Sequence, residues 1–171
     1  GQIRDEVYVY GSFVQSKMAK AGVVCSNCHN PHSNALVAEG NAVCTQCHKS
    51  ETYDAPTHHR HLATSTGSAC VACHMPSQVY MGVDARRDHS MRIPRPGVSL
   101  STGSPNACTQ CHLDRTDSWA YDALQQWGVD TDFQELSLVK ARVSADRGDV
   151  RSLPTLESVV TDDERSPLMR A

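Results

Sequence analysis

The residues most able to do chemistry in this chain of 171 residues are its eight cysteines, which all fall in pairs of one spacing. Two residues separate the cysteines of each pair, and a histidine follows the second cysteine at once. The predicted attachment cysteines are Cys25 and Cys28, Cys44 and Cys47, Cys70 and Cys73, and Cys108 and Cys111, and the histidines that follow them are His29, His48, His74 and His112. Two thiols on one turn can form thioether bonds to the vinyl groups of a haem, and the adjacent imidazole can bind its iron. The spacing therefore predicts four covalently bound c-type haems.

Three other roles for paired cysteines explain the pattern less well. The 15 residues between Cys28 and Cys44 fit a zinc ribbon, but the 34 residues between Cys73 and Cys108 do not. Disulfides would close very tight loops, and thioredoxin-type dithiols would need a surrounding βαβ pattern that the sequence lacks. None of these roles explains a histidine after every pair.

The second axial ligand of each iron decides between an electron carrier and an enzyme. Four irons need four ligands besides the motif histidines, and five histidines remain for them. These candidates are His32, His58, His59, His61 and His89. Because five candidate histidines are available for four open axial positions, the sequence favours bis-histidine coordination at all four irons. Such irons would be low-spin and closed to substrate. The sequence thus predicts electron transfer and no catalytic residue.

Sequence spacing suggests which role each of the five candidate histidines takes. His32 lies three residues after His29, too near to reach the far side of the same iron, so a neighbouring haem is its expected partner. His58 and His61 are the preferred ligands from the HHRH segment. His59 is the expected surplus, although it could replace either of them or bind a haem in another chain. His89 is the fourth candidate. Methionine is an alternative ligand, at residue 75 or 81, and would raise the potential of the haem it binds.

The apolar composition is consistent with cofactors in the interior. Leu, Ile, Val and Phe make up 31 of 171 residues, 18 of them in residues 1–120 and 13 in residues 121–171. Such a low content is unusual for a core made of side chains alone. Low net charge and paired cysteines argue against disorder. We therefore expect the haems to supply the core of the region that carries the motifs.

The elements that must position the motifs are short. Apolar periodicity predicts a helix at about residues 5–20, and prolines divide residues 25–112 into loops and helical turns with few or no strands. Further helices are expected at about 116–127, 133–147 and 152–161, the first capped by Thr116 or Asp117 and ended by Gly128. The predicted fold is mostly α and irregular, with a haem-cored tetrahaem domain at residues 1–115 and a helical tail at residues 116–171.

Several functional classes are disfavoured. No stretch approaches 18 uninterrupted apolar residues, so no transmembrane segment is predicted. The net charge of −3 and the absence of a long basic block disfavour nucleic acid. A chain that starts at Gly1 without methionine is expected to be an exported protein after removal of its signal.

Four arginines near His89 could pair with haem propionates; they are Arg86, Arg87, Arg92 and Arg95.

Residues from Glu6 to Trp119 resemble the multihaem c-type cytochrome domain of the doubled-CXXCH class. The resemblance rests on EVYVYGSFVQSKMAKAGVVCSNCHNPHS, GNAVCTQCHKSETYDAPTHHRH, CVACHMPSQVYMGVDARRDHSMRIPRPG and SPNACTQCH. It implies electron transfer outside the cytoplasm, with His32, the histidines of residues 58–61 and His89 as distal ligands. The tail RGDVRSLPTLESVVTDDERSPLMRA resembles the start of the helical repeats that often follow this domain, here cut off after one unit.

A small tetrahaem chain with a surplus histidine is also similar to the extracellular tetrahaem cytochromes that polymerise into conductive filaments. In those proteins a histidine of one subunit can bind a haem of the next. The resemblance implies redox proteins and neighbouring copies of the chain as partners, and it favours the extracellular side or the cell surface over the periplasm. The alternative is a multihaem enzyme of the nitrite or hydroxylamine type, which would need one iron with an open position. Reduction potentials and the redox partners are left open.

Overall fold

The computed structural model describes residues 8–129, 136–165 and 170, and its chain divides into two compact units. One unit comprises residues 6–93, and the other comprises residues 94–171 together with residues 1–5. The fourth CxxCH motif therefore belongs to the same unit as the C-terminal helices. The domain boundary after residue 115, which marks where haem attachment should end, stays a prediction.

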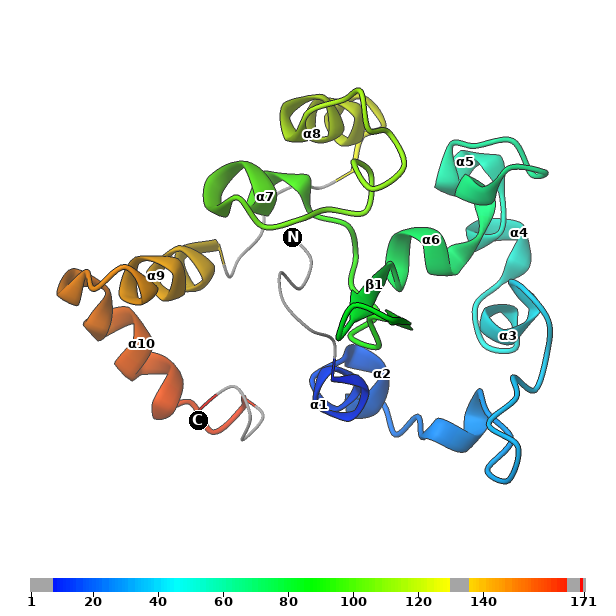
Figure 1. Ribbon diagram of the computed structural model, residues 1–171, viewed down its shortest axis with the longest axis horizontal. Coiled ribbons are helices and arrows are strands. Elements are labelled where there is room, and N and C mark those ends of the chain that lie inside the picture. Colours follow the sequence, from blue (N-terminus) through cyan, green and yellow to red (C-terminus); the bar gives the residue numbers. More distant parts are fainter. Residues whose placement is uncertain (1–7, 130–135, 166–169, 171) are drawn as a thin grey trace. The chain divides into compact units, whose positions relative to one another are not determined.

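The unit of residues 6–93 consists of short helices and turns (Figure 1). Its helical elements are α1 (Val9–Val14), α2 (Lys17–Lys20), η1 (Cys25–Asn27), α3 (Ala42–Thr45), α4 (Ser50–Tyr53), α5 (Pro56–His59), η2 (Thr66–Ser68) and α6 (Cys70–His74). A two-stranded antiparallel sheet joins β1 (Ser77–Tyr80) to β2 (Asp84–Arg87). The predicted class, mostly α and irregular with few strands, is confirmed for the described residues.

The prediction of one helix over residues 5–20 is wrong for the part that the structure describes. Ser16 has an extended backbone, and its hydroxyl accepts a hydrogen bond of 3.1 Å from the N–H of Ala19, so it caps α2. Serine favours this role because its side chain competes with the backbone for hydrogen bonds. The segment therefore forms two helices, while residues 5–7 lie outside the described part.

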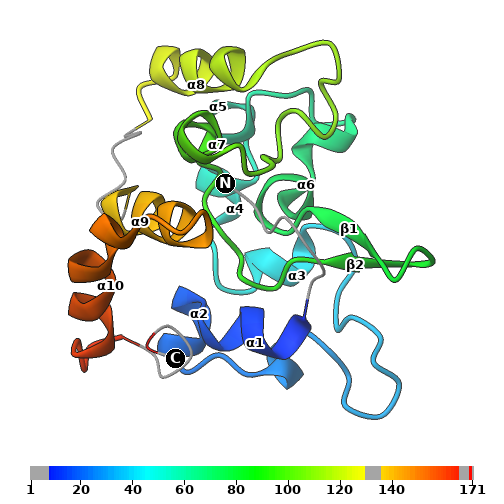
Figure 2. The ribbon, with the colours of Figure 1, turned by 60° about the vertical axis from the view of Figure 1, so that its left-hand side comes forward.

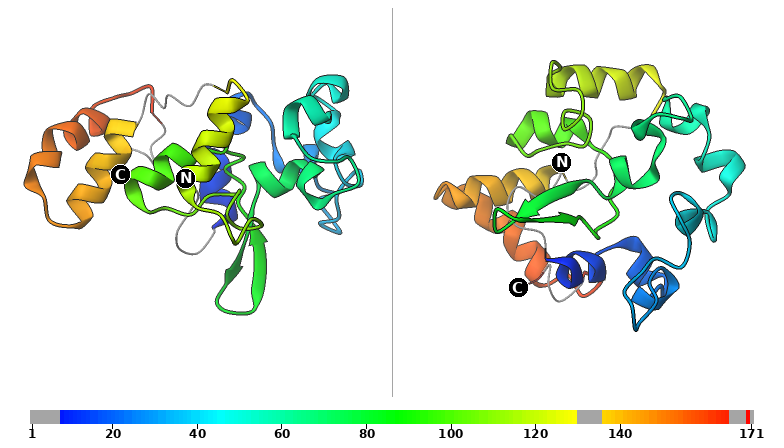
Figure 3. Two further views of the ribbon diagram at one scale, coloured as in Figure 1. Left: turned by 90° about the horizontal axis from the view of Figure 1, so that it is seen from above. Right: turned by 45° about the vertical axis from the view of Figure 1, so that its right-hand side comes forward.

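The β-hairpin was not expected, because Ser, Asp and Arg are poor strand formers. Ser77 pairs with Arg87 and Tyr80 with Asp84, and Gly82 takes a positive φ of 77° in the connecting turn. The guanidinium of Arg86 lies 3.9 Å from the centre of the Tyr80 ring and pairs with Asp84 at 2.7 Å. The contact of Arg86 with Tyr80 crosses the sheet and stabilises the hairpin, which Figures 2 and 3 show as a double ribbon, whereas Arg86 and Asp84 lie in the same strand.

The second unit is built from longer helices. They are α7 (Pro96–Thr102), α8 (Asp117–Gln126), α9 (Leu136–Asp146), η3 (Val150–Ser152) and α10 (Leu153–Val160). The Thr116 hydroxyl accepts a hydrogen bond of 3.2 Å from the N–H of Trp119, which confirms the predicted cap of α8. Helices α9 and α10 confirm two further predictions, except that residues 133–135 lie outside the described part. Helix α7 was not predicted, because its prolines were taken for loop punctuation although Pro96 occupies the first turn, where proline is tolerated.

The buried apolar side chains are concentrated in this second unit. Among the described residues, the buried valines, alanines and leucines are Val98, Ala107, Ala120, Leu124, Leu138, Ala141 and Val159. In the unit of residues 6–93, by contrast, Leu62 is 78% exposed and Val83 is 89% exposed. The motif-rich unit thus buries little apolar surface of its own, as the composition predicts.

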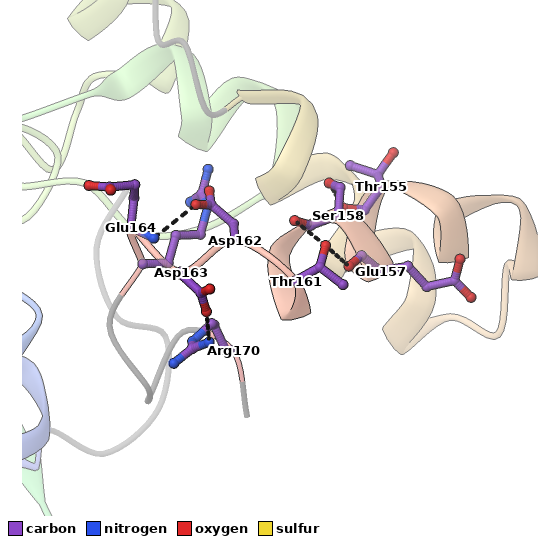
Figure 4. Close-up of polar contacts among 9 residues, drawn as sticks. Thr155, Glu157, Ser158, Thr161, Asp162, Asp163, Glu164 and Arg170 are labelled. Carbon is purple, nitrogen blue, oxygen red and sulfur yellow. Dashed lines mark hydrogen bonds and ion pairs between the residues drawn. The ribbon is translucent and has the colours of Figure 1, made fainter.

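Polar contacts close the end of the second unit (Figure 4). The Thr161 hydroxyl donates to the carbonyl of Glu157 at 3.3 Å at the end of α10. Beyond it, Arg170 pairs with Asp163 at 2.6 Å. These contacts satisfy the last carbonyl groups of α10 and join Arg170 to the turn that follows the helix.

Candidate functional site

Each CxxCH motif folds as a single helical turn. The N–H of His29 donates to the carbonyl of Cys25 at 2.9 Å, and the same contact recurs in the second motif at 3.1 Å and in the fourth at 2.9 Å. The third motif forms the whole of helix α6, Cys70–His74. In all four motifs the two thiols and the imidazole therefore lie on one turn. This is the arrangement that covalent haem attachment requires, so the residues present fit the group.

The predicted attachment cysteines differ in their exposure. Cys25, Cys47 and Cys111 are exposed, whereas the other five, Cys28, Cys44, Cys70, Cys73 and Cys108, are half-buried. The first, second and fourth motifs therefore each combine one exposed thiol with one half-buried thiol. Attachment of haem at these eight cysteines stays a prediction.

Cys47 and Cys111 are exposed, and Leu113, two residues after Cys111, is itself 83% exposed. The expectation that haems supply the core of the motif-bearing region stays a prediction. A thioether bond tolerates such exposure, because it holds the cofactor without surrounding protein.

All eight cysteines are free thiols, so none of the motifs closes a disulfide. Burial raises the pKa of the Cys44 thiol to about 11, and the neighbouring Cys70 adds to this effect. Burial likewise raises the pKa of Cys28, Cys70 and Cys108, and the nearby Cys47 adds to the effect at Cys28. The described residues hold no group of three or more His, Cys, Asp or Glu side chains that could bind a bare metal ion.

Asn41 joins the second motif to the third. It precedes α3, and its Oδ1 accepts a hydrogen bond of 2.9 Å from the N–H of Cys70. Its Nδ2 donates to the carboxylate of Asp54 at 2.7 Å and to the carbonyl of Ser68 at 3.0 Å. The Cys44 and Cys70 thiols also lie near enough for each to affect the pKa of the other. The second and third CxxCH motifs are therefore adjacent in space.

Asn106 supports the fourth motif in a similar way and is almost fully buried, at 1% exposure. Its Oδ1 accepts from the N–H groups of Cys108 and Thr109 at 3.0 and 3.1 Å, and its Nδ2 donates to Asp117 at 2.6 Å. The motif is thereby joined to the first turn of α8. Sequence reasoning missed both asparagines, although each precedes an alanine just before a CxxCH motif and that shared pattern could have revealed them.

Two motif histidines face predicted distal histidines. The rings of His29 and His89 stack with centroids 6.3 Å apart and planes at 29°. The rings of His58 and His74 stack with centroids 6.1 Å apart and planes at 10°. His58 lies in α5 and His74 ends α6, two helices of the same unit (Figure 1). The structure thus brings together two of the motif histidines with two of the five candidates.

Backbone carbonyls hold one nitrogen of several of these rings. The Nδ1 of His29 lies 3.1 Å from the carbonyl oxygen of Asn34, and the Nδ1 of His74 lies 3.0 Å from that of Arg92. The Nδ1 of His89 lies 2.9 Å from the carbonyl oxygen of Arg87, the residue that ends β2. A carbonyl can only accept, so each Nδ1 carries the proton and each Nε2 keeps its lone pair for a metal.

The HHRH segment bends sharply after α5. Arg60 takes a left-handed conformation with φ of 58°, which ends the helix and redirects the chain before His61. The backbone N–H of His61 donates to the Nδ1 of His59 at 3.2 Å, and the Nδ1 of His61 contacts the carbonyl of His59. Burial lowers the pKa of His58, with a smaller contribution from His74. His32 lies apart in the exposed loop after the first motif, where its N–H donates to Asn30 at 2.9 Å.

Two aromatic residues that sequence reasoning missed lie against motif histidines. Tyr53 makes edge-to-face contacts with His48, centroids 5.5 Å apart, and with His58, centroids 5.4 Å apart. Trp119 lies 4.8 Å from the His112 ring. Aromatic rings at these distances restrict the orientation of an imidazole and limit the access of water to it.

Three of the arginines predicted to bind propionates have protein partners. Arg86 pairs with Asp84, Arg92 donates to the hydroxyl of Ser90 at 2.9 Å, and Arg87 donates to the carbonyl of Met75 at 3.1 Å. The last contact fastens the hairpin to the end of α6. Binding of propionates by this cluster stays a prediction.

Comparison with known proteins bears on the first two motifs. Residues 17–53 match the family defined by the doubled CXXCH motif, which implies binding of haem c and supports a multihaem c-type cytochrome with a role in electron transfer. No curated protein and no solved structure shows significant similarity to the chain. Among the described residues, no helix is both long and apolar enough to cross a membrane.

Proposed function

We propose that this protein is an electron carrier with four covalently bound c-type haems, each iron held by two histidines, and that it works outside the cytoplasm. The observation that carries the proposal is the recurrence of the same one-turn CxxCH geometry in all four motifs. The match to the doubled CXXCH family over the first two motifs supports it. The proposal extends haem binding from those two motifs to all four.

The roles of the residues follow from their positions. Each pair of cysteines would hold one haem through thioether bonds, and the histidine next to them would bind the iron from one side. When bound, haem supplies a one-electron couple between ferric and ferrous iron. Covalent attachment needs little surrounding protein, which agrees with the sparse apolar burial of residues 8–93. Bis-histidine ligation leaves no position for substrate, so we infer that the protein is not an enzyme.

Short distances between attachment sites support passage of electrons along the chain. Asn41 holds the second and third motifs together, and the Cys44 and Cys70 thiols lie near enough for Cys70 to raise the pKa of Cys44. Haems bound there would lie close to each other, because the thioether sulfurs are bonded directly to their edges. We infer that these two haems form one of the fast steps of the path.

The fourth motif has no second histidine within its own unit. His112 is the only histidine of residues 94–171, the bulk of the second unit. A second histidine for its iron must come from residues 6–93 or from another copy of the chain. We propose that neighbouring copies assemble into an extracellular filament, with other redox proteins as electron donors and acceptors. Electron microscopy of the purified protein tests this, and uniformly monomeric particles under all conditions would rule it out.

Haem content and spin state test the central proposal. We expect the mass of the intact protein to equal that of the chain with four haems, and the optical and EPR spectra to contain only low-spin haem. Fewer than four haems would contradict the proposed stoichiometry. A high-spin component in the wild-type protein would instead favour the alternative, a multihaem enzyme of the nitrite or hydroxylamine type with an open iron position.

A further inference from the structure

The stacked histidine pairs assign individual ligands to individual irons. We propose that His58 is the second ligand of the iron bound by His74, and that His89 is the second ligand of the iron bound by His29. This assignment rests on the proposed function, because it presumes that each iron takes two histidines. It goes further by naming which histidine serves which haem.

The first argument is the spacing of the rings. A metal–imidazole bond is about 2 Å long, and the bound nitrogen lies about 1.2 Å from the ring centre, so two imidazoles on opposite sides of one iron have centroids about 6.3 Å apart. The observed separations are 6.3 Å for His29 and His89 and 6.1 Å for His58 and His74. The ring planes meet at 29° and 10°, angles that two imidazoles on one iron can adopt. Both pairs therefore have the separation expected of two histidines that share one iron.

The second argument is the state of the ring nitrogens. His29, His74 and His89 each direct Nδ1 to a backbone carbonyl, at 3.1, 3.0 and 2.9 Å. A ligand histidine usually donates its other ring N–H to such a group, which fixes the tautomer and orients the ring. Three of the four paired imidazoles thus have Nε2 available for iron before any haem is present.

The pair formed by His59 and His61 has a similar centroid separation, 6.5 Å, but it does not make an iron site. Neither residue belongs to a CxxCH motif, and every iron of a c-type haem already has a motif histidine as one ligand. In addition, His59 accepts a backbone N–H at Nδ1, so its proton lies on Nε2. His59 is therefore not an iron ligand in this assignment.

The remaining assignments follow by subtraction. The irons of His48 and His112 still need second ligands, and the candidates left are His32 and His61. The Nδ1 of His61 faces the carbonyl of His59, which leaves its Nε2 for a metal. Five candidates thus reduce to four ligands and one histidine that shapes the turn after α5.

Single substitutions in the full-length holoprotein test the assignment. We expect His58→Ala and His89→Ala each to convert one haem in four from low-spin to high-spin in the EPR spectrum, while the intact mass still corresponds to four haems. Added imidazole should restore the low-spin spectrum, which separates loss of a ligand from loss of the fold. His59→Ala, one residue from His58, is the matched control and should leave all four haems low-spin.

A conservative variant gives a second readout if the alanine variants fold poorly. His58→Met keeps six-coordinate iron, and we expect it to raise one midpoint potential in four while the other three stay unchanged. The wild-type protein could carry four low-spin haems while the His58→Ala variant also keeps all four low-spin. That result overturns the assignment, and the proposed function stands. If the wild-type protein lacks four low-spin haems, the proposed function itself fails.

A variant that lacks the third haem tests whether His58 binds the same iron as His74. In Cys70→Ala/Cys73→Ala, we expect three low-spin haems, and adding His58→Ala should create no high-spin haem because the iron it served is gone. One high-spin haem among the three would overturn the pairing with His74. Cryo-electron microscopy of the wild-type holoprotein decides the same question, since density joining His58 to any other iron contradicts the assignment.

Discussion

The side-chain Oδ1 of Asn41 accepts a hydrogen bond of 2.9 Å from the backbone N–H of Cys70, 29 residues further along the chain. The same side chain donates to Asp54 and to the carbonyl of Ser68. One amide therefore fixes the start of the third CxxCH turn against the start of the second. In a unit with few buried apolar side chains, such polar links carry a large share of the tertiary specificity.

Asn41→Ala should destabilise the protein by about 1–3 kcal/mol, because it removes three hydrogen bonds and leaves their partners unpaired. Thermal unfolding followed by circular dichroism measures the effect. Gln46→Ala is the matched control, since its amide makes one local hydrogen bond of 2.9 Å to Val43 and its loss should cost about 0.5 kcal/mol or less. An equal change in both variants would show that Asn41 has no special role.

Protein produced without haem attachment should lose structure selectively. We expect amide hydrogens in residues 8–93 to exchange rapidly, because that unit buries little apolar surface without its cofactors. Helices α8, α9 and α10 should retain protection, since they bury Leu124, Leu138 and Val159. Hydrogen exchange with mass spectrometry measures both. Native-like protection in residues 8–93 of the apo-protein would contradict a haem-filled core.

Trp119→Ala should shift one midpoint potential in four to a more negative value. The Trp119 ring lies 4.8 Å from that of His112, and its removal would admit water near the iron, which stabilises the ferric charge. Spectroelectrochemical titration measures the potentials. Trp127→Ala, a change at the exposed end of the same helix, serves as the control and should leave all four unchanged.

Gly97→Val should destabilise the second unit by about 1–3 kcal/mol through overpacking. A Cβ at Gly97 would lie 3.2 Å from two ring carbons of Tyr121, where α7 approaches α8 closely. Gly11→Val tests the same substitution in α1, where a Cβ would meet nothing within 4 Å, and should have little effect. Chemical denaturation gives the free energies of unfolding. A stable Gly97→Val protein would mean that Tyr121 can move aside.

Local signals predicted a good part of the fold. Thr116 was correctly expected as a cap, and Gly128 and Gly148 take the positive φ values that follow the ends of α8 and α9. The predictions of secondary structure failed at two places, where a side chain competes with the backbone for a hydrogen bond or where contacts between distant residues stabilise an element. Ser16 divides a periodic apolar segment by capping a second helix, and Arg86 stabilises a hairpin through Tyr80 across the sheet rather than through strand propensity.

The sequence by itself determined the chemistry of attachment, because a CxxCH motif spans one turn and its thiols and imidazole are set by spacing along the chain. Only the tertiary structure decided which distant groups meet. His29 faces His89 across 60 residues of sequence, and Asn41 reaches Cys70, because the intervening turns and the hairpin direct the chain back on itself. Composition could count the candidate ligands, but the path of the backbone determines which histidine rings lie near one another.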